Sequence, residues 1–136
     1  MRRASFVLAL ILPALVGCDE VFFAGPDDIF LRTDRTQYAA GDTAILRLVN
    51  ESGETIGYNL CGHLVQQLSD DGWVDTLYGH DGPCTAIWYR LRHDDSDTHP
   101  APLDASTSPG TYRFRTRVDA GSEGEFPVYS PSFEIE

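Results

Sequence analysis

The chain has 136 residues, of which 42% are hydrophobic and 23% are charged, and its formal net charge is −11. This composition is typical of a globular protein, and the length allows one modest core but no separate cofactor domain. So acidic a surface repels a phosphate backbone, which excludes nucleic acid as an expected partner. Because like-charged copies also repel one another, we expect a monomer.

The first 17 residues have the features of an export signal. Arg2 and Arg3 form a basic start, and Phe6–Leu15 is an apolar run interrupted by Pro13. The run is too short for an ordinary transmembrane helix. Without the two arginines, eight Lys and Arg remain against 21 Asp and Glu, which gives a net charge of −13.

The signal ends in Leu15-Val16-Gly17-Cys18. This segment resembles the lipobox of bacterial lipoproteins, a family in which the cysteine thiol receives a diacylglycerol and the signal is cut before the cysteine. The resemblance implies a lipid on Cys18, a short tether over residues 18–28, and a location in the bacterial cell envelope, on a membrane and facing the periplasm or the exterior. A plain signal peptide with a cysteine near its cleavage site is the alternative.

Two further cysteines, Cys61 and Cys84, remain in the exported part. An even pair in an oxidising compartment favours a disulfide. Closing a loop of roughly 24 residues stabilises a fold by about 3 kcal/mol, because the unfolded chain loses entropy. A zinc site is the competing interpretation, but two cysteines without a CxxC partner are weak evidence for zinc.

From Ile29 onward the chain consists of short apolar runs separated by turn residues. The runs that we expect to form strands are 29–33, 43–50, 56–68, 73–78, 86–91, 110–118 and 128–136. Asp71-Gly72 between two apolar runs predicts a hairpin. No segment of the exported part keeps helical spacing of apolar residues over about 11 positions. About seven short strands therefore predict an all-β antiparallel sandwich over residues 29–136.

The run Gly110–Val118 has the clearest alternation. Its inward face carries Tyr112, Phe114, Thr116 and Val118, and its outward face carries Arg113, Arg115 and Arg117. In the last run, Glu134 and Glu136 point outward, so opposite charges meet if the two runs pair. We interpret the arginine row as a solvated sheet face; a docking stripe for an acidic partner is the alternative.

Five segments together resemble bacterial immunoglobulin-like domains. They are Ala40-Gly41-Asp42, the strand end Leu48-Val49-Asn50, Tyr58-Asn59-Leu60-Cys61, Asp71-Gly72-Trp73 and Pro109-Gly110-Thr111-Tyr112-Arg113-Phe114. The resemblance includes lipoprotein domains of unassigned function and, more distantly, the intracellular proteinase inhibitor type. It implies an immunoglobulin-like β-sandwich in which Tyr112 forms a tyrosine corner, with its hydroxyl bonded to the backbone of the preceding loop. The cysteines do not sit where antibody domains join their sheets.

No catalytic constellation stands out in this sequence, which lacks a GxSxG elbow, so we expect neither an enzyme nor a cofactor. One segment, His93–His99, suggests a metal. Asp95 and Asp97 could supply oxygen ligands to calcium, and His93 and His99 could supply nitrogen ligands to zinc or copper. Because the spacing matches no established loop, we expect an acidic, solvated turn without metal.

Trp88 is a candidate for a partner surface. If Ile87, Tyr89 and Leu91 point inward, Trp88 and Arg90 share the outer side of their strand. The candidate surface then consists of Trp88, Arg90, Arg113, Arg115 and Arg117.

We expect a membrane-tethered module that binds another envelope protein. The alternative is a proteinase inhibitor whose disulfide-tied loop, Gly79–Cys84, enters a protease cleft as an extended strand.

Overall fold

The structure is a computed structural model that describes residues 27–78 and 83–136. This part contains eleven strands and two short 3-10 turns, η1 (Leu60–Gly62) and η2 (Gly121–Glu123), and no α-helix. It also contains no helix long and apolar enough to cross a membrane. The predicted signal, the predicted lipid site at Cys18 and residues 18–26 of the predicted tether lie outside the described residues.

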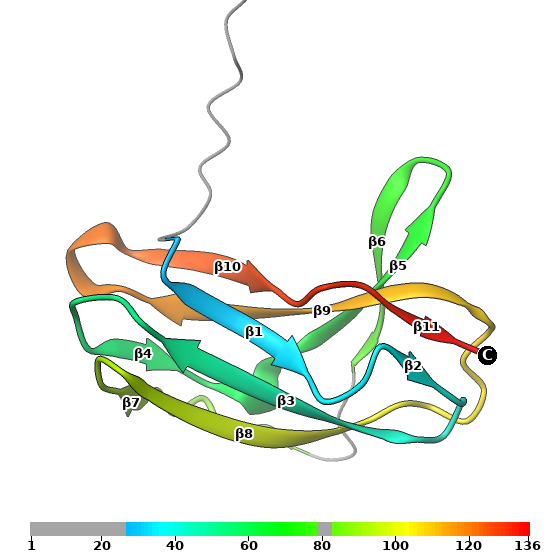
Figure 1. Cartoon of the computed structure of the whole chain (residues 1–136), viewed down its shortest axis with the longest axis horizontal. Coiled ribbons are helices and arrows are strands. Elements are labelled where there is room, and N and C mark those ends of the chain that lie inside the picture. The colour runs from blue at the N-terminus through cyan, green and yellow to red at the C-terminus, as the bar shows by residue number, and fades with distance from the viewer. Residues whose placement is uncertain (1–26, 79–82) are drawn as a thin grey trace, which may run out of the picture.

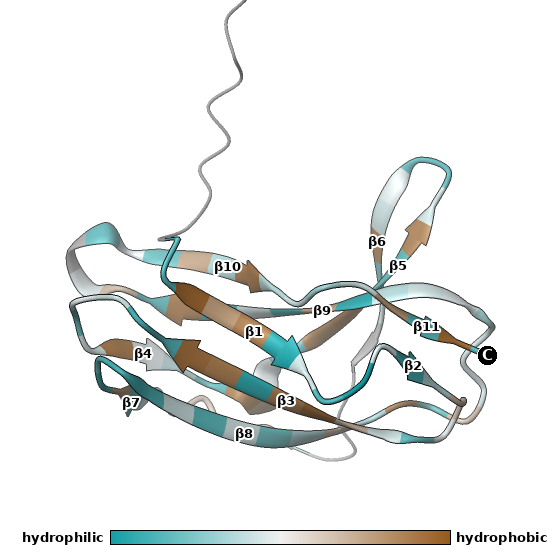
Figure 2. Cartoon of the chain, viewed as in Figure 1, coloured by the Kyte–Doolittle hydropathy of each residue, from teal (hydrophilic) through white to brown (hydrophobic). Residues whose placement is uncertain are grey.

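Two sheets form the domain (Figure 1). Sheet A has three antiparallel strands in the order β1-β3-β8, which are β1 (Ile29–Thr33), β3 (Thr43–Asn50) and β8 (Asp95–Pro102). Its apolar residues are concentrated in β1 and β3, whereas β8 is largely hydrophilic (Figure 2). Strand β8 contributes one buried apolar residue, Ala101, to the core.

Sheet B is built around the long strand β9 (Gly110–Asp119). One side of β9 pairs with β10 (Glu125–Tyr129) and β11 (Phe133–Ile135), and the other side pairs with β4 (Ile56–Tyr58) and β5 (Leu64–Ser69). Farther out lie β2 (Gln37–Tyr38), parallel to β11, β6 (Gly72–Tyr78), paired with β5, and β7 (Tyr89–Leu91), paired with β4. The predicted hairpin at Asp71-Gly72 is the β5–β6 hairpin, which projects from the sandwich (Figure 1).

The predicted fold class is therefore confirmed: the domain is an antiparallel immunoglobulin-like β-sandwich. The structure has more strands than the sequence predicts because interruptions divide two long runs and because β2 and β8 lie outside the predicted runs. Residues 59–63 separate β4 from β5, Ser130–Ser132 separates β10 from β11, and the first strand crosses from sheet A to sheet B between β1 and β2. The predicted run 86–91 is paired only over Tyr89–Leu91.

The expected turn at His93–His99 is present only at His93 and Asp94, and the rest of the expectation is wrong. From Asp95 onward these residues belong to β8, which pairs with β3 along its whole length, from Asn50↔Asp95 to Thr43↔Pro102. An edge strand tolerates acidic residues and proline, because half of its backbone groups face solvent and unwanted pairing is discouraged. The sequence of β8 therefore lacks the apolar alternation of an ordinary half-buried strand.

The predicted tyrosine corner is present. The hydroxyl of Tyr112 donates to the carbonyl oxygen of Ser108 at 2.6 Å, and the ring is buried. Tyr112 also stacks on Phe133, while Phe133 stacks on Phe114, with ring centroids 6.2 and 5.0 Å apart. These rings hold the loop before β9 and the C-terminal strand β11 against one core.

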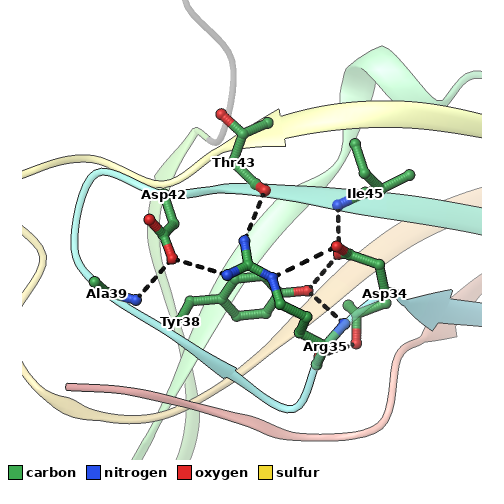
Figure 3. Close-up of polar contacts among 8 residues, drawn as sticks. Asp34, Arg35, Tyr38, Ala39, Asp42, Thr43 and Ile45 are labelled. Carbon is green, nitrogen blue, oxygen red and sulfur yellow. Dashed lines mark hydrogen bonds and ion pairs between the residues drawn. The ribbon is translucent and has the colours of Figure 1, made fainter.

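A polar network fixes the crossing of the chain from sheet A to sheet B (Figure 3). The Oδ1 atom of Asp34 accepts hydrogen bonds from the N–H of Ile45 at 2.8 Å and the hydroxyl of Tyr38 at 2.7 Å. The guanidinium of Arg35 lies 4.6 Å from the centre of the Tyr38 ring and donates to Oδ2 of Asp42 at 3.2 Å. The network thereby ties the end of β1 to β3 and to the start of β2.

Within the described residues, Thr116 Oγ1 is the buried side-chain polar atom that lacks a hydrogen-bond partner. Replacing Thr116 by valine removes this hydroxyl and preserves the shape, so we expect Thr116→Val to raise the free energy of unfolding by about 1 kcal/mol in urea denaturation. Thr111→Val is the control, because the Thr111 hydroxyl donates to Glu134 Oε1 at 2.7 Å. A loss of stability in Thr116→Val would show that the hydroxyl is hydrogen-bonded.

Candidate partner-binding surface

The structure brings the predicted partner residues to one face, the outer face of sheet B. Arg113, Arg115 and Arg117 alternate along β9 with side chains that are buried in the core. Arg90 lies in β7 beside the buried Leu91. Trp88 lies on the same face, because its indole covers Gly57: a Cβ atom added there would be 3.4 Å from Trp88 Cε3.

Arg113 belongs to a stack of side chains. Its guanidinium carbon lies 4.3 Å from the ring centre of Trp73 and 4.0 Å from that of Tyr129. Its Nε donates to Gln66 Oε1 at 2.8 Å. Partial burial lowers the pKa of this guanidinium from its usual value, although arginine stays charged at neutral pH. Arg113 thus joins the β5–β6 hairpin to β9 and β10.

The other two arginines of the row have acidic neighbours. Arg115 Nη2 lies 3.6 Å from Asp75 Oδ2, and Arg117 forms an ion pair with Glu125. The predicted meeting of opposite charges is present, but Glu125 of β10 supplies it, while Glu134 accepts a hydrogen bond from Thr111. The row is already compensated within the domain, which favours a solvated sheet face over a docking stripe for an acidic partner.

Three consecutive large apolar residues are exposed beside this face. We call them the Trp88 patch: Ile87 is 54% exposed, Trp88 45% and Tyr89 50%. The prediction for Trp88 is confirmed, and the inward placement of Ile87 is wrong. Tyr89 pairs with the buried Tyr58, with ring centroids 6.0 Å apart, so its side chain lies on the inner side although it is half exposed at the sheet edge. Strand pairing begins only at Tyr89, at the edge of sheet B, so the period of a strand does not extend back to Ile87.

A hollow lies on each side of Trp88. One, of about 330 Å³, is bounded by Asn59, Cys84 and Arg117 together with Ile87 and Trp88. The other, of about 220 Å³, lies among Thr55, Arg90 and Asp119. Trp88 therefore forms a ridge between two depressions, a shape that a complementary protein surface can enclose from both sides.

The predicted disulfide is present in the structure. It joins Cys61, on η1, to Cys84, and the Cα atoms are 5.6 Å apart. Close by, Asn59 Nδ2 donates to the carbonyl oxygen of Thr85 at 2.6 Å, and Asn59 Oδ1 accepts from the N–H of Cys61 at 3.0 Å. The disulfide and the hydrogen bond from Asn59 to Thr85 attach residues 83–88 to the segment 59–63 between β4 and β5. The sequence offers no signal for the role of Asn59.

The weak metal candidates do not converge. Asp97 accepts the hydroxyl of Tyr58 at 2.6 Å; burial of that tyrosine, and then the carboxylate beside it, raise the Tyr58 pKa above its usual range. His93 instead contacts the carbonyl oxygen of Ser52 and lies 3.0 Å from Asp94. Asp95 and His99 lie on the edge strand β8. Over residues 27–78 and 83–136, no three His, Cys, Asp or Glu side chains form a group that could hold a metal ion.

No family model and no curated protein sequence matches the chain. Among solved structures it is similar to the ASH / PapD-like domain of human CEP192 (PapD-like domain 7), with 12% sequence identity and a TM-score of 0.38. The alignment covers 98% of this chain and 98% of that chain.

Proposed function

We propose that this protein is a non-enzymatic lipoprotein of the bacterial cell envelope, whose immunoglobulin-like domain binds another envelope protein through the Trp88 patch. The observation that carries this proposal is the exposure of three consecutive large residues, Ile87, Trp88 and Tyr89. Tryptophan and tyrosine are enriched among residues that dominate protein interfaces, and large exposed apolar side chains that gather at one sheet edge are typical of a binding site. The arginines around it supply a polar rim.

The anchor rests on a separate observation, the resemblance of Leu15-Val16-Gly17-Cys18 to a lipobox. Two or three acyl chains hold a protein firmly at a bilayer, whereas a single chain gives only marginal binding. Fractionation of cells that express Cys18→Ser tests it: the variant should leave the membrane fraction. A variant that stays firmly membrane-bound would contradict the anchor and leave the binding role to be tested separately.

The binding role is tested by affinity capture from native membranes with quantitative mass spectrometry. Truncating an aromatic residue at the centre of an interface weakens binding by about 30-fold or more. We therefore expect Trp88→Ala to lose most of a reproducible partner that wild type captures. Thr98→Ala, on the exposed surface of β8, is the matched control and should retain it. Equal capture by both variants would contradict a role for the patch.

Inhibition of a protease is the second candidate. The loop predicted for it, Gly79–Cys84, falls largely outside the described residues, and the disulfide at Cys84 is the observation that favours it. A tied loop loses less entropy when it enters a cleft. Assays against serine proteases and metalloproteases decide between the candidates: sub-micromolar inhibition supports an inhibitor, and its absence with Trp88-dependent capture supports the binding module.

A further inference from the structure

We propose that the Cys61–Cys84 disulfide is a redox-operated latch that holds the Trp88 patch in its binding position. The proposal deepens the proposed function by naming how the same surface is regulated. The two cysteines differ in their surroundings: Cys61 lies in a segment that packs against the core, whereas Cys84 lies in a segment without strand pairing.

The half that carries Cys61 is firmly anchored. Cys61 lies on η1, between the buried Leu60 and the fully buried His63. The Nδ1 atom of His63 is 2.7 Å from the carbonyl oxygen of Leu60, and its ring packs edge-to-face on Phe114 with centroids 5.5 Å apart. This half of the latch is therefore held by core packing, whatever the state of the sulfur atoms.

The half that carries Cys84 has few attachments. Residues 83–88 form no strand, although β7 begins directly after them. Besides the disulfide, the segment is held by the hydrogen bond from Asn59 to Thr85 and by the packing of Trp88 on Gly57. A segment with so few attachments opens locally at low free-energy cost. When Cys61 and Cys84 are oxidised to the disulfide, the residues that present Trp88 are therefore attached to the firmly packed η1.

The latch also shapes the larger hollow beside Trp88. That hollow is bounded on one side by Asn59 and Gly62 of the segment 59–63 and on the other by residues 84–88. The disulfide and the hydrogen bond from Asn59 to Thr85 both connect its two walls. Both cysteines are partly exposed, so a reductant can reach the sulfur atoms.

Opening the latch is a thiol–disulfide exchange with a dithiol reductant. The reductant donates two electrons and two protons, the S–S bond breaks, thiols form on Cys61 and Cys84, and the reductant becomes a disulfide. In an oxidising envelope the latch is closed and the patch is ordered for its partner. Under reducing conditions, before export or beside a dithiol reductant, the patch loses its fixed position.

Hydrogen exchange with a short labelling pulse tests the latch on the full chain. Oxidised wild type is compared with dithiothreitol-reduced wild type and with the Cys61→Ser/Cys84→Ser double variant. We expect the amides of β7 (Tyr89–Leu91), the first paired strand after the segment, to exchange about tenfold faster or more in both disulfide-free forms, while those of β9 stay protected during the pulse. A Trp73→Phe background leaves Trp88 as the sole tryptophan, and its quenching by acrylamide should rise on reduction.

Two results would overturn the latch. Unchanged exchange of β7 together with unchanged acrylamide quenching of Trp88 would show that other contacts hold the segment. Exchange of β9 within the same pulse would show that the disulfide maintains the whole fold and no local latch. This test does not depend on the partner. If the exchange difference is observed but the oxidised protein captures no partner, the proposed function is contradicted and the latch is supported.

Discussion

Phe133→Ala should lower the free energy of unfolding by about 4 kcal/mol, the largest loss that we expect from a single substitution here. Phe133 is 1% exposed, and its ring contacts the rings of Phe114, Tyr112 and Tyr38. Truncation removes the apolar side chain, leaves a cavity between strands β2, β9 and β11, and ends these aromatic contacts. Urea denaturation followed by circular dichroism measures the loss.

Phe30→Ala is the matched control for this prediction. Phe30 lies on β1, is only partly buried and contacts the guanidinium of Arg32 on the outer side of sheet A. Its truncation creates no enclosed cavity, so we expect a loss of about 1 kcal/mol. Equal losses in the two variants would show that Phe133 is not at the centre of the core.

Asp34→Ala should cost about 3 kcal/mol, because it breaks the network in Figure 3 at its centre. The N–H of Ile45 and the hydroxyl of Tyr38 both lose their acceptor, and the carboxylate no longer lies beside the Arg35 guanidinium, 3.6 Å away. Hydrogen bonds to a charged acceptor contribute more than neutral ones. Asp104→Ala is the control, since Asp104 is exposed and accepts only from Ser106 within its own turn.

The same carboxylate should make stability depend on pH. Partial burial alone would raise the pKa of Asp34, but the hydrogen bonds from Ile45 and Tyr38 outweigh it and hold the pKa below its usual value. A lowered pKa in the folded state stabilises the fold above the unfolded value of about 3.9, and the contribution disappears as the pH falls through the folded value. The difference between wild type and Asp34→Asn should therefore shrink below about pH 4. A difference that does not change with pH would contradict the role of the charge.

The sequence predicts those strands that have one solvent-exposed face and one buried face. Ala44, Leu46 and Leu48 in β3 and the arginine row of β9 alternate with a period of two, and the structure confirms both strands. Strand β8 has no such period, because only Ala101 along it is a buried apolar residue. Its conformation is set by pairing with β3, and pairing partners are tertiary information.

The candidate surface is predictable to a similar extent. The alternation around Trp88 places its side chain outward, as the structure confirms. The exposure of Ile87 depends on where pairing with β4 begins, and that of Tyr89 on the position of β7 at the edge of sheet B; no local pattern encodes either. Gly57 between Ile56 and Tyr58 is the one available signal, because a glycine within a strand often marks the close approach of another group, here the indole of Trp88.

Photo-crosslinking in living cells tests the central claim most directly. The full chain would carry p-benzoylphenylalanine at position 88 or, as a control, at position 98 on the exposed surface of β8. If the Trp88 patch faces a partner in the envelope, position 88 forms a discrete covalent adduct with one membrane-associated protein and position 98 does not. The absence of an adduct at position 88, or the same adduct from both positions, would contradict the account.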